Sequence, residues 1–244
     1  MEYPFKERFR DACVATLCPE VCINCGTTPV RGRPLCGTCL DAMLDSVRAL
    51  GGTRSITRCA KCGRPLVSAS GTCVSCRLLP SLSAVDSILP LFPYSATAHE
   101  LLGAWKTRGN RGLTWSFAKI IQEALGLPEF EKATVIPVPP RPDKIREKGW
   151  DQIEDIARIL ERSLGLTVCR CLTRTSRIAQ KTLGRAARQQ NLKGHLETIA
   201  GISLPETAVI IDDLMTTGST IDACADALKA AGCGKVCGLT LFFD

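Results

Sequence analysis

The chain has 244 residues, of which 45% are hydrophobic and 23% are charged, a composition typical of a folded globular protein. Its apolar runs stay short of the roughly 20 residues that a membrane-spanning helix needs. The N-terminus has scattered charges and no signal-peptide pattern, so we expect a cytoplasmic protein. The formal net charge is +7, but aromatic residues make up only 5%, which disfavours a surface that stacks nucleobases.

The cysteine count distinguishes this chain from an ordinary globular protein. Fifteen cysteines, an odd number without a signal peptide, disfavour a secreted disulfide framework. Eight of them form the tandem repeat C-x-x-C-x₁₀-C-x-x-C, in which each close pair has metal-ligand spacing. The first copy contains Cys22, Cys25, Cys36 and Cys39, and the second contains Cys59, Cys62, Cys73 and Cys76.

This spacing predicts two structural Zn²⁺ ions, because each turn brings two sulfurs to one tetrahedral metal and four thiolates leave no open ligand position. The pairs can combine into sites sequentially or crosswise, and the tandem repeat favours the sequential arrangement. A redox role for one C-x-x-C pair lacks the surrounding βαβ pattern. The seven remaining cysteines are expected to be buried as small apolar residues. They are Cys13, Cys18, Cys169, Cys171, Cys224, Cys233 and Cys237. We therefore expect a zinc-binding domain over 1–80 and a second domain over 81–244.

After Cys76 the pattern changes to short apolar runs that alternate with helical periodicity. Two stretches, 152–164 and 221–231, place their apolar residues on one helical face. Such alternation predicts an α/β fold with a mainly parallel sheet flanked by helices. Ligands of such sheets bind at the carboxyl ends of the strands. The expected strands are 85–92, 133–138, 166–172, 208–212 and 235–243.

The segment that follows the expected strand 208–212 carries the most specific chemistry. Asp212 and Asp213 end this strand, and a turn rich in hydroxyl side chains, with Gly218, opens the next helix. A helix N-terminus offers unpaired N–H groups and a positive dipole end, which suit a phosphate. The paired carboxylates can accept hydrogen bonds from sugar hydroxyls. The alternative is an ordinary strand, turn and helix whose hydroxyls only cap the helix.

The thirteen residues AVIIDDLMTTGST, positions 208–220, resemble the fingerprint with which type I phosphoribosyltransferases bind phosphoribosyl pyrophosphate (PRPP). The resemblance implies that Asp212 and Asp213 are the catalytic acids and hold the ribose 2′- and 3′-hydroxyls. It implies that the following loop wraps the 5′-phosphate and that Mg²⁺ accompanies PRPP. The PRPP-binding residues of this loop would be Met215, Thr216, Thr217, Gly218, Ser219 and Thr220.

Nearly the whole chain resembles the ComF family of competence-associated, type I phosphoribosyltransferase-like proteins, which carry an N-terminal double zinc ribbon. The resemblance rests on the cysteine pairs, the segment VIPVPPRPDKIREKGWDQ at 135–152, the fingerprint, and Gln180, Leu183, Arg188 and Asn191. The family usually shows R-G-F-N-Q where this chain has KGWDQ at 148–152, so Asp151 is assigned no role. The family comparison implies competence machinery as a partner.

The resemblance suggests two further parts of the site. The turn after 135–139 would bind pyrophosphate. The segment 170–193, which has seven basic residues and no acidic one, corresponds to a mobile loop that closes over PRPP. A segment with only basic charges favours contact with a polyanion over a solvated surface. The pyrophosphate candidates are Arg141, Lys144, Arg146 and Lys148, and the loop candidates are Gln180, Arg188 and Asn191.

Two functions remain open at this point. The first is a Mg²⁺-dependent phosphoribosyl transfer with pyrophosphate release. The second is a non-catalytic module that senses PRPP or binds single-stranded DNA during uptake. Because only one helix and one strand follow the fingerprint, we expect either that the zinc domain supplies the hood that recognises an acceptor, or that there is no small-base acceptor.

Overall fold

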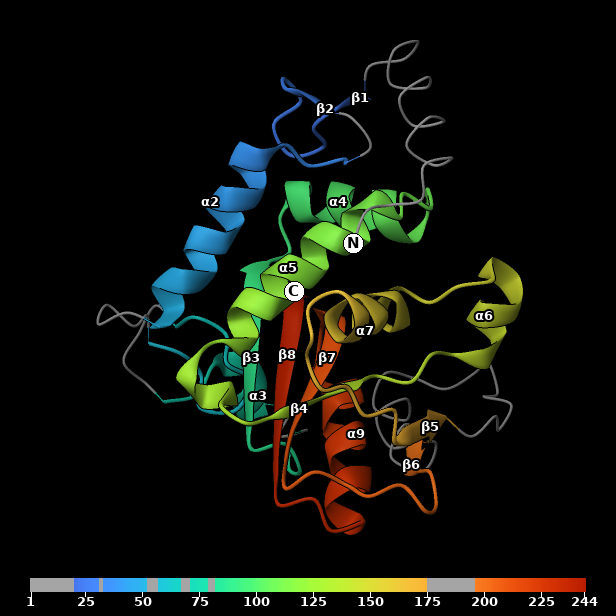
Figure 1. Cartoon of the computed structure of the whole chain (residues 1–244). Helices are drawn as coiled ribbons and strands as arrows, with labels where there is room; N and C mark the ends of the chain where they lie inside the picture. Colours follow the sequence, from blue (N-terminus) through green and yellow to red (C-terminus); the bar gives the residue numbers. More distant parts are fainter. Residues whose placement is uncertain (1–19, 31–32, 52–56, 67–70, 79–81, 175–195) are drawn as a thin grey trace.

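The computed structural model describes residues 20–30, 33–51, 57–66, 71–78, 82–174 and 196–244. Its centre is a four-stranded sheet in the order β3-β8-β7-β4, and every pair of neighbours is parallel (Figure 1). The predicted parallel sheet flanked by helices is therefore confirmed. The strands are β3 (Ser87–Pro93), β4 (Thr134–Pro137), β7 (Thr207–Met215) and β8 (Lys235–Phe243).

The sheet separates two hydrophobic cores. Val209 and Ile211 point into the first core, whereas Ala208 and Ile210 point into the second, as the two-residue period of a strand requires. Helices α4, α5 and α7 belong to the first core, and α9 belongs to the second. These helices span α4 (Ala96–Lys106), α5 (Gly112–Leu125), α7 (Gln152–Arg162) and α9 (Ser219–Ala230).

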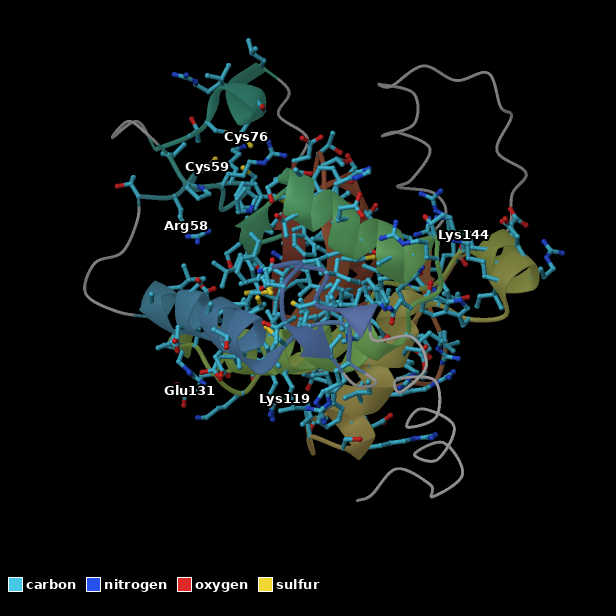
Figure 2. The ribbon with its side chains drawn as sticks, turned by 90° about the horizontal axis from the view of Figure 1, so that it is seen from above. Arg58, Cys59, Cys76, Lys119, Glu131 and Lys144 are labelled. Atoms are coloured by element: carbon cyan, nitrogen blue, oxygen red, sulfur yellow. The ribbon has the colours of Figure 1, made fainter. Side chains whose placement is uncertain are left out.

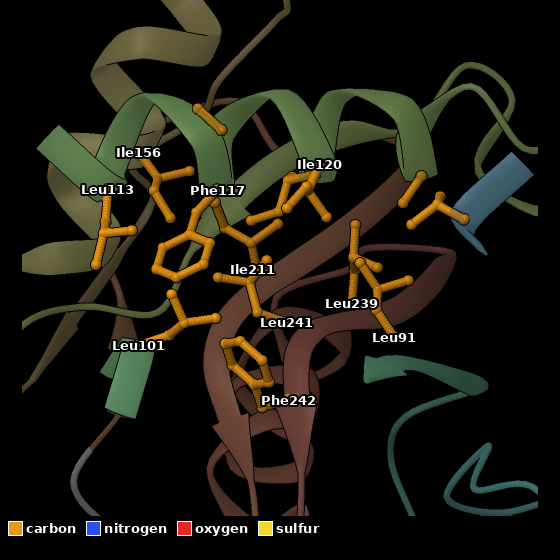
Figure 3. Packing of buried hydrophobic residues seen from close by; sticks show 14 of the residues in the cluster. Leu91, Leu101, Leu113, Phe117, Ile120, Ile156, Ile211, Leu239, Leu241 and Phe242 are labelled. Atoms are coloured by element: carbon orange, nitrogen blue, oxygen red, sulfur yellow. The ribbon is translucent and has the colours of Figure 1, made fainter. Parts of the chain in front are cut away.

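Aromatic packing fixes α5 on the sheet. Phe117 of α5 lies edge-on to Trp105, at 4.8 Å between ring centroids, and to Phe242 of β8, at 5.9 Å. Figure 3 shows Phe117, Leu113 and Ile120 above the sheet residues. The indole N–H of Trp105 donates to the Thr114 hydroxyl at 2.9 Å, so its polar group is satisfied inside the core.

The two cysteine modules pack on opposite sides of this sheet. Cys22, Cys36 and Cys39 lie in the first core, where α2 (Gly37–Arg48) packs against α5. Cys59 and Cys62 instead lie in the second core, together with α9. The smaller elements of the modules are β1 (Glu20–Val21), β2 (Pro29–Val30), η1 (Ala49–Gly51) and α3 (Val74–Leu78). The boundary predicted at residue 80 lies outside the described residues and stays a prediction.

The predicted strand 166–172 is only partly present. Val168 forms a single parallel bridge with Val135, in which Val135 N–H donates to Thr167 and Cys169 N–H donates to Val135. The next donor from β4 would be Pro137, which has no N–H, so this ladder stops. The chain turns away and forms a separate antiparallel pair. That pair consists of β5 (Leu172–Arg174) and β6 (Leu196–Thr198), and the remaining elements are η2 (Pro128–Phe130) and α6 (Pro142–Lys148).

Equivalent glycines of the two modules provide a test of this packing. Gly26 and Gly63 both have positive φ, 68° and 69°, and both donate to the first cysteine of their module. A Cβ at Gly63 would lie 1.7 Å from the Ile88 carbonyl oxygen, whereas one at Gly26 would meet nothing within 4 Å. Gly26→Ala should therefore lower the free energy of unfolding only by the roughly 1–2 kcal/mol that left-handed backbone strain costs. Gly63→Ala should lower it clearly more, as measured by urea denaturation. Equal losses would contradict the packing of the second module on β3.

Candidate functional site

The loop between β7 and α9 forms a small hollow at the carboxyl edge of the sheet. Strand β7 continues through both aspartates to Met215 rather than ending at Asp212 as expected. The hollow opens to solvent and is lined by Asp212 and residues 214–221. It thus includes all the predicted PRPP-binding residues except Asp213.

Hydroxyl groups and a left-handed glycine shape this hollow. The Thr217 and Ser219 hydroxyls are hydrogen-bonded at 2.7 Å, and Gly218 caps α9 with φ 76°. A Cβ at Gly218 would lie 2.9 Å from Leu82. The positive φ therefore favours glycine here, and a side chain would also displace the end of the Leu82 side chain.

The two aspartates differ in their surroundings. Asp213 forms an ion pair with Lys106 at the end of α4, 2.7 Å from Nζ to Oδ2. Asp212 accepts the Asp213 N–H at 2.8 Å. Burial and the charge of Asp213 raise the pKa of Asp212 to about 7, although Lys106 and Arg174 act in the opposite direction. Such a raised carboxyl pKa is common where a group is held for function rather than for stability.

Lys106 is a site residue that the sequence interpretation missed. It lies more than a hundred positions from Asp213, at the end of a helix with no recognisable motif. Its backbone carbonyl accepts a hydrogen bond from Lys148 Nζ at 2.8 Å. Lys106 therefore joins the paired acids to one of the four pyrophosphate candidates.

The other pyrophosphate candidates are arranged along α6, a helix where the sequence suggested a turn. Arg146 forms an ion pair with Asp143 of the same helix at 2.6 Å. Lys144 lies on α6 at the rim of the molecule (Figure 2). Arg141 precedes the helix and lies close enough to Arg174 for its charge to lower the pKa of Arg174. Arg141 and Lys148 are thus the candidates connected to the aspartate site.

The basic segment 170–193 is described only up to Arg174. Arg170 is neutralised by Glu154 and Glu161, each at 3.0 Å, so its charge has a partner within the protein. Arg174 is partly buried, and this burial is the main cause that lowers its pKa. The charge of Arg141 lowers the pKa further, whereas Cys224 and Asp212 act in the opposite direction. Its Nε is buried without a hydrogen-bond partner in the described part of the chain. The loop candidates Gln180, Arg188 and Asn191 lie outside the described residues.

Asp151, to which the sequence assigned no role, caps α7. Its carboxylate accepts from the Ile153 and Glu154 N–H groups, both at 3.0 Å. Burial raises the pKa of Asp151, and these two N–H groups oppose that shift. Asparagine, which the family usually has here, caps helices in the same way.

The eight paired cysteines form two clusters, each with its four sulfurs within 4.8 Å of one another. The sequential pairing is therefore confirmed, and each cluster can hold one Zn²⁺. Each cluster contains an equivalent hydrogen bond: the Cys36 N–H donates to Cys22 Sγ in the first, and the Cys73 N–H donates to Cys59 Sγ in the second, both at 3.3 Å. The second cysteine pair of each module lies at the start of a helix, α2 or α3, instead of forming another turn like that of the first pair.

Local hydrogen bonds favour thiolates in both clusters. The Thr27 hydroxyl, with nearby N–H groups, lowers the pKa of Cys25 to about 5. Burial raises the pKa of Cys59, but N–H groups that include those of Cys62 and Cys73 outweigh it and bring the pKa to about 6. Burial raises the pKa of Cys62 to about 11. A divalent cation would relieve the cost of ionising such a buried thiol.

The unpaired cysteines largely follow their prediction. Cys171, Cys224, Cys233 and Cys237 are buried and Cys169 is partly buried. Cys13 and Cys18 lie outside the described residues.

Comparison with known proteins agrees with this arrangement. No family model matches the chain. The chain is 24% identical over 200 residues to the competence protein ComFC of Streptococcus pneumoniae strain ATCC BAA-255 / R6, which covers 82% of this chain and 85% of that protein. The resemblance to the ComF family is confirmed. As in the ComF pattern, both four-cysteine clusters precede the α/β part. Among the described residues, every helix is too short or too polar to cross a bilayer.

The zinc sites lead to a direct prediction. Protein purified without chelator should contain two Zn²⁺ per chain, because each cluster supplies a complete tetrahedral ligand set. Cys76→Ser should retain one zinc, as measured by elemental analysis, whereas Cys237→Ser, outside both clusters, should retain two. One zinc or none in the wild-type protein would contradict the two-site arrangement.

The raised pKa of Asp212 leads to a prediction about stability. The ordinary value is 3.8 and the folded value about 7, so between these limits the folded protein binds a proton that the unfolded chain releases. The contribution of Asp212 to stability is therefore fully present below the ordinary pKa and declines as the pH rises to about 7. Asp212→Asn should raise the free energy of unfolding by roughly 1 kcal/mol or more at about pH 8, and by less at about pH 5.

Urea denaturation at the two pH values measures this difference. Asp226→Asn, at an exposed position of α9, is the control and should give no such gain. The same change in unfolding free energy at both pH values would show that Asp212 is not held in an unfavourable environment.

Proposed function

We propose that this protein binds PRPP at the β7–α9 loop and acts as a Mg²⁺-dependent phosphoribosyltransferase that releases pyrophosphate, with a role in DNA uptake. The observation that carries the proposal is the position of Asp212 and of Asp213, which is ion-paired with Lys106, immediately before a hydroxyl-lined hollow at the start of α9. A helix cap alone needs neither of the two carboxylates.

The hollow suits the 5′-phosphate of the ligand. The positive end of α9 favours an anion, and Thr217, Ser219 and Thr220 supply hydroxyl donors around it. The hollow is small, so it fits the phosphate group while the sugar extends toward the aspartates.

The aspartates suit the ribose. Ionised Asp212 and Asp213 can accept hydrogen bonds from the two adjacent hydroxyls, and Lys106 holds Asp213 in place. An oxocarbenium-like transition state carries positive charge on the sugar, which two nearby carboxylates stabilise. Because both aspartates must be ionised to accept these hydrogen bonds, ligand binding would be strongest at a pH above the pKa of Asp212.

The pyrophosphate would lie toward α6. Arg141 and Lys148 are near the aspartate site, and Arg174 offers a buried N–H without a partner in the described residues. When bound, Mg²⁺ would be held mainly by PRPP oxygens and water, and would neutralise the leaving group.

The second candidate is a binding protein. The relative's name, competence protein ComFC, supports a role in competence, and the basic segment supports contact with single-stranded DNA. The internal pairing of Arg170 removes one charge from that argument. PRPP-dependent release of pyrophosphate in the presence of an acceptor distinguishes an enzyme from a PRPP sensor.

Calorimetry with Mg²⁺-PRPP tests the shared core of both candidates. Replacing Asp212 and Asp213 with alanine removes two charged acceptors, so affinity should fall at least roughly a hundredfold. Asp226→Ala, at an exposed position of α9, is the matched control and should bind like the wild type. Undiminished binding by the double variant would mean that the loop only caps α9, and it would overturn the proposed function.

A further inference from the structure

Three contacts connect the second cysteine module and the residues after it to the β7–α9 loop. Arg64 Nη2 donates to the Thr216 carbonyl of the loop. Leu82 lies against Gly218. The Asp222 carboxylate, in the first turn of α9, accepts from the backbone N–H groups of residues 83, 84 and 85, at 2.8, 2.8 and 3.2 Å.

The cysteine cluster itself determines where Arg64 lies. Arg64 follows Cys62 by two positions, and its carbonyl accepts from the Cys59 N–H at 2.8 Å. Gly63, between them, is pressed against the carbonyl of Ile88 in β3. The backbone of Arg64 is therefore part of the metal-binding turn, and this turn is anchored on the sheet.

The contact with Thr216 orients the peptide that follows. In a planar trans peptide, the carbonyl of Thr216 and the N–H of Thr217 point in opposite directions. Arg64 is not among the residues that line the hollow, whereas Thr216 and Thr217 are. The hydrogen bond from Arg64 to the Thr216 carbonyl thus directs the Thr217 N–H away from Arg64.

Charge supports the same role. Arg64 places a guanidinium against the outer side of the loop, and its Nε is buried without a hydrogen-bond partner in the described residues. A fixed positive charge next to a phosphate site favours the anion even without direct contact.

We propose that Arg64 is a positioning residue for the phosphate site and that zinc binding in the second cluster is coupled to phosphate-ester binding in the loop. The inference rests on the proposed function and goes beyond it, since it assigns to one of the two zinc ions a role in ligand affinity. The first cluster lies in the other core, beside α5, and is not coupled in this way.

Ribose 5-phosphate is the probe, because it carries the phosphate ester without pyrophosphate. In calorimetry, Arg64→Met should weaken its binding about tenfold, and Arg64→Lys, which keeps a donor and the charge, should restore part of the loss. Arg77→Met is the matched control, since Arg77 is exposed on α3 of the same module and should have no effect. Zinc content is measured for each variant.

The coupling has a second readout that does not depend on catalysis. Because coupling between two sites is reciprocal, ribose 5-phosphate should tighten one of the two zinc ions in equilibrium competition with a chelator and leave the other unchanged. Arg64→Met should remove this protection. A merely structural role for Arg64 would not make zinc affinity depend on the sugar phosphate.

The outcomes separate the two proposals. If wild-type protein fails to bind ribose 5-phosphate and PRPP, the proposed function fails. If it binds both, and Arg64→Met with two zinc ions binds ribose 5-phosphate equally well, the phosphate site stands and the role of Arg64 is overturned. Protection of both zinc ions, or of neither, would overturn the assignment of coupling to the second cluster.

Discussion

Two neighbouring carboxylates near the end of a central parallel strand are the constraint around which this molecule is arranged. Strand β7 lies between β8 and β4, so its carboxyl end is surrounded by protein on both sides. Ionising Asp212 and Asp213 together is unfavourable there. Lys106 from α4 and Arg174 from β5 bring positive charge to the pair, and only Lys106 contacts it directly. A ligand with hydroxyl donors would supply hydrogen bonds to the carboxylate oxygens that these cations do not contact.

The cysteine repeat shows how one local structure serves two positions. Both modules have the same turn, the same N–H to sulfur hydrogen bond and a helix at the second cysteine pair. Their surroundings differ, because the first extends into the long helix α2 on α5 and the second ends in the short helix α3. The same four-cysteine arrangement can therefore hold a metal ion on two different faces of the α/β fold.

Much of the fold could be predicted from the sequence, because it depends on local patterns. Strands β3, β7 and β8 are long apolar runs, and the tandem cysteine repeat favoured the sequential clusters over crossed ones. The segment 166–172 was harder to predict, because its pairing depends on the missing N–H of Pro137 in another strand. Lys106 and Arg64 were not predicted, since neither belongs to a motif and each makes its contact from far away in the chain. Lys106 contacts Asp213 of β7, and Arg64 contacts Thr216 of the following loop.

The attachment of the second cysteine module to the proposed phosphate loop has a physical rationale. A loop that must order itself around a phosphate loses conformational entropy on binding, which lowers affinity. The hairpin of the second module and its five-residue helix are too short to form a core of their own, so a metal bound by the four cysteines would supply their rigidity. Through Arg64 and the residues that Asp222 holds, this rigidity reaches the loop before any ligand arrives. On this argument the second cysteine module supports the outer side of the proposed phosphate loop, a different place from the hood over an acceptor that the sequence suggested for the zinc domain.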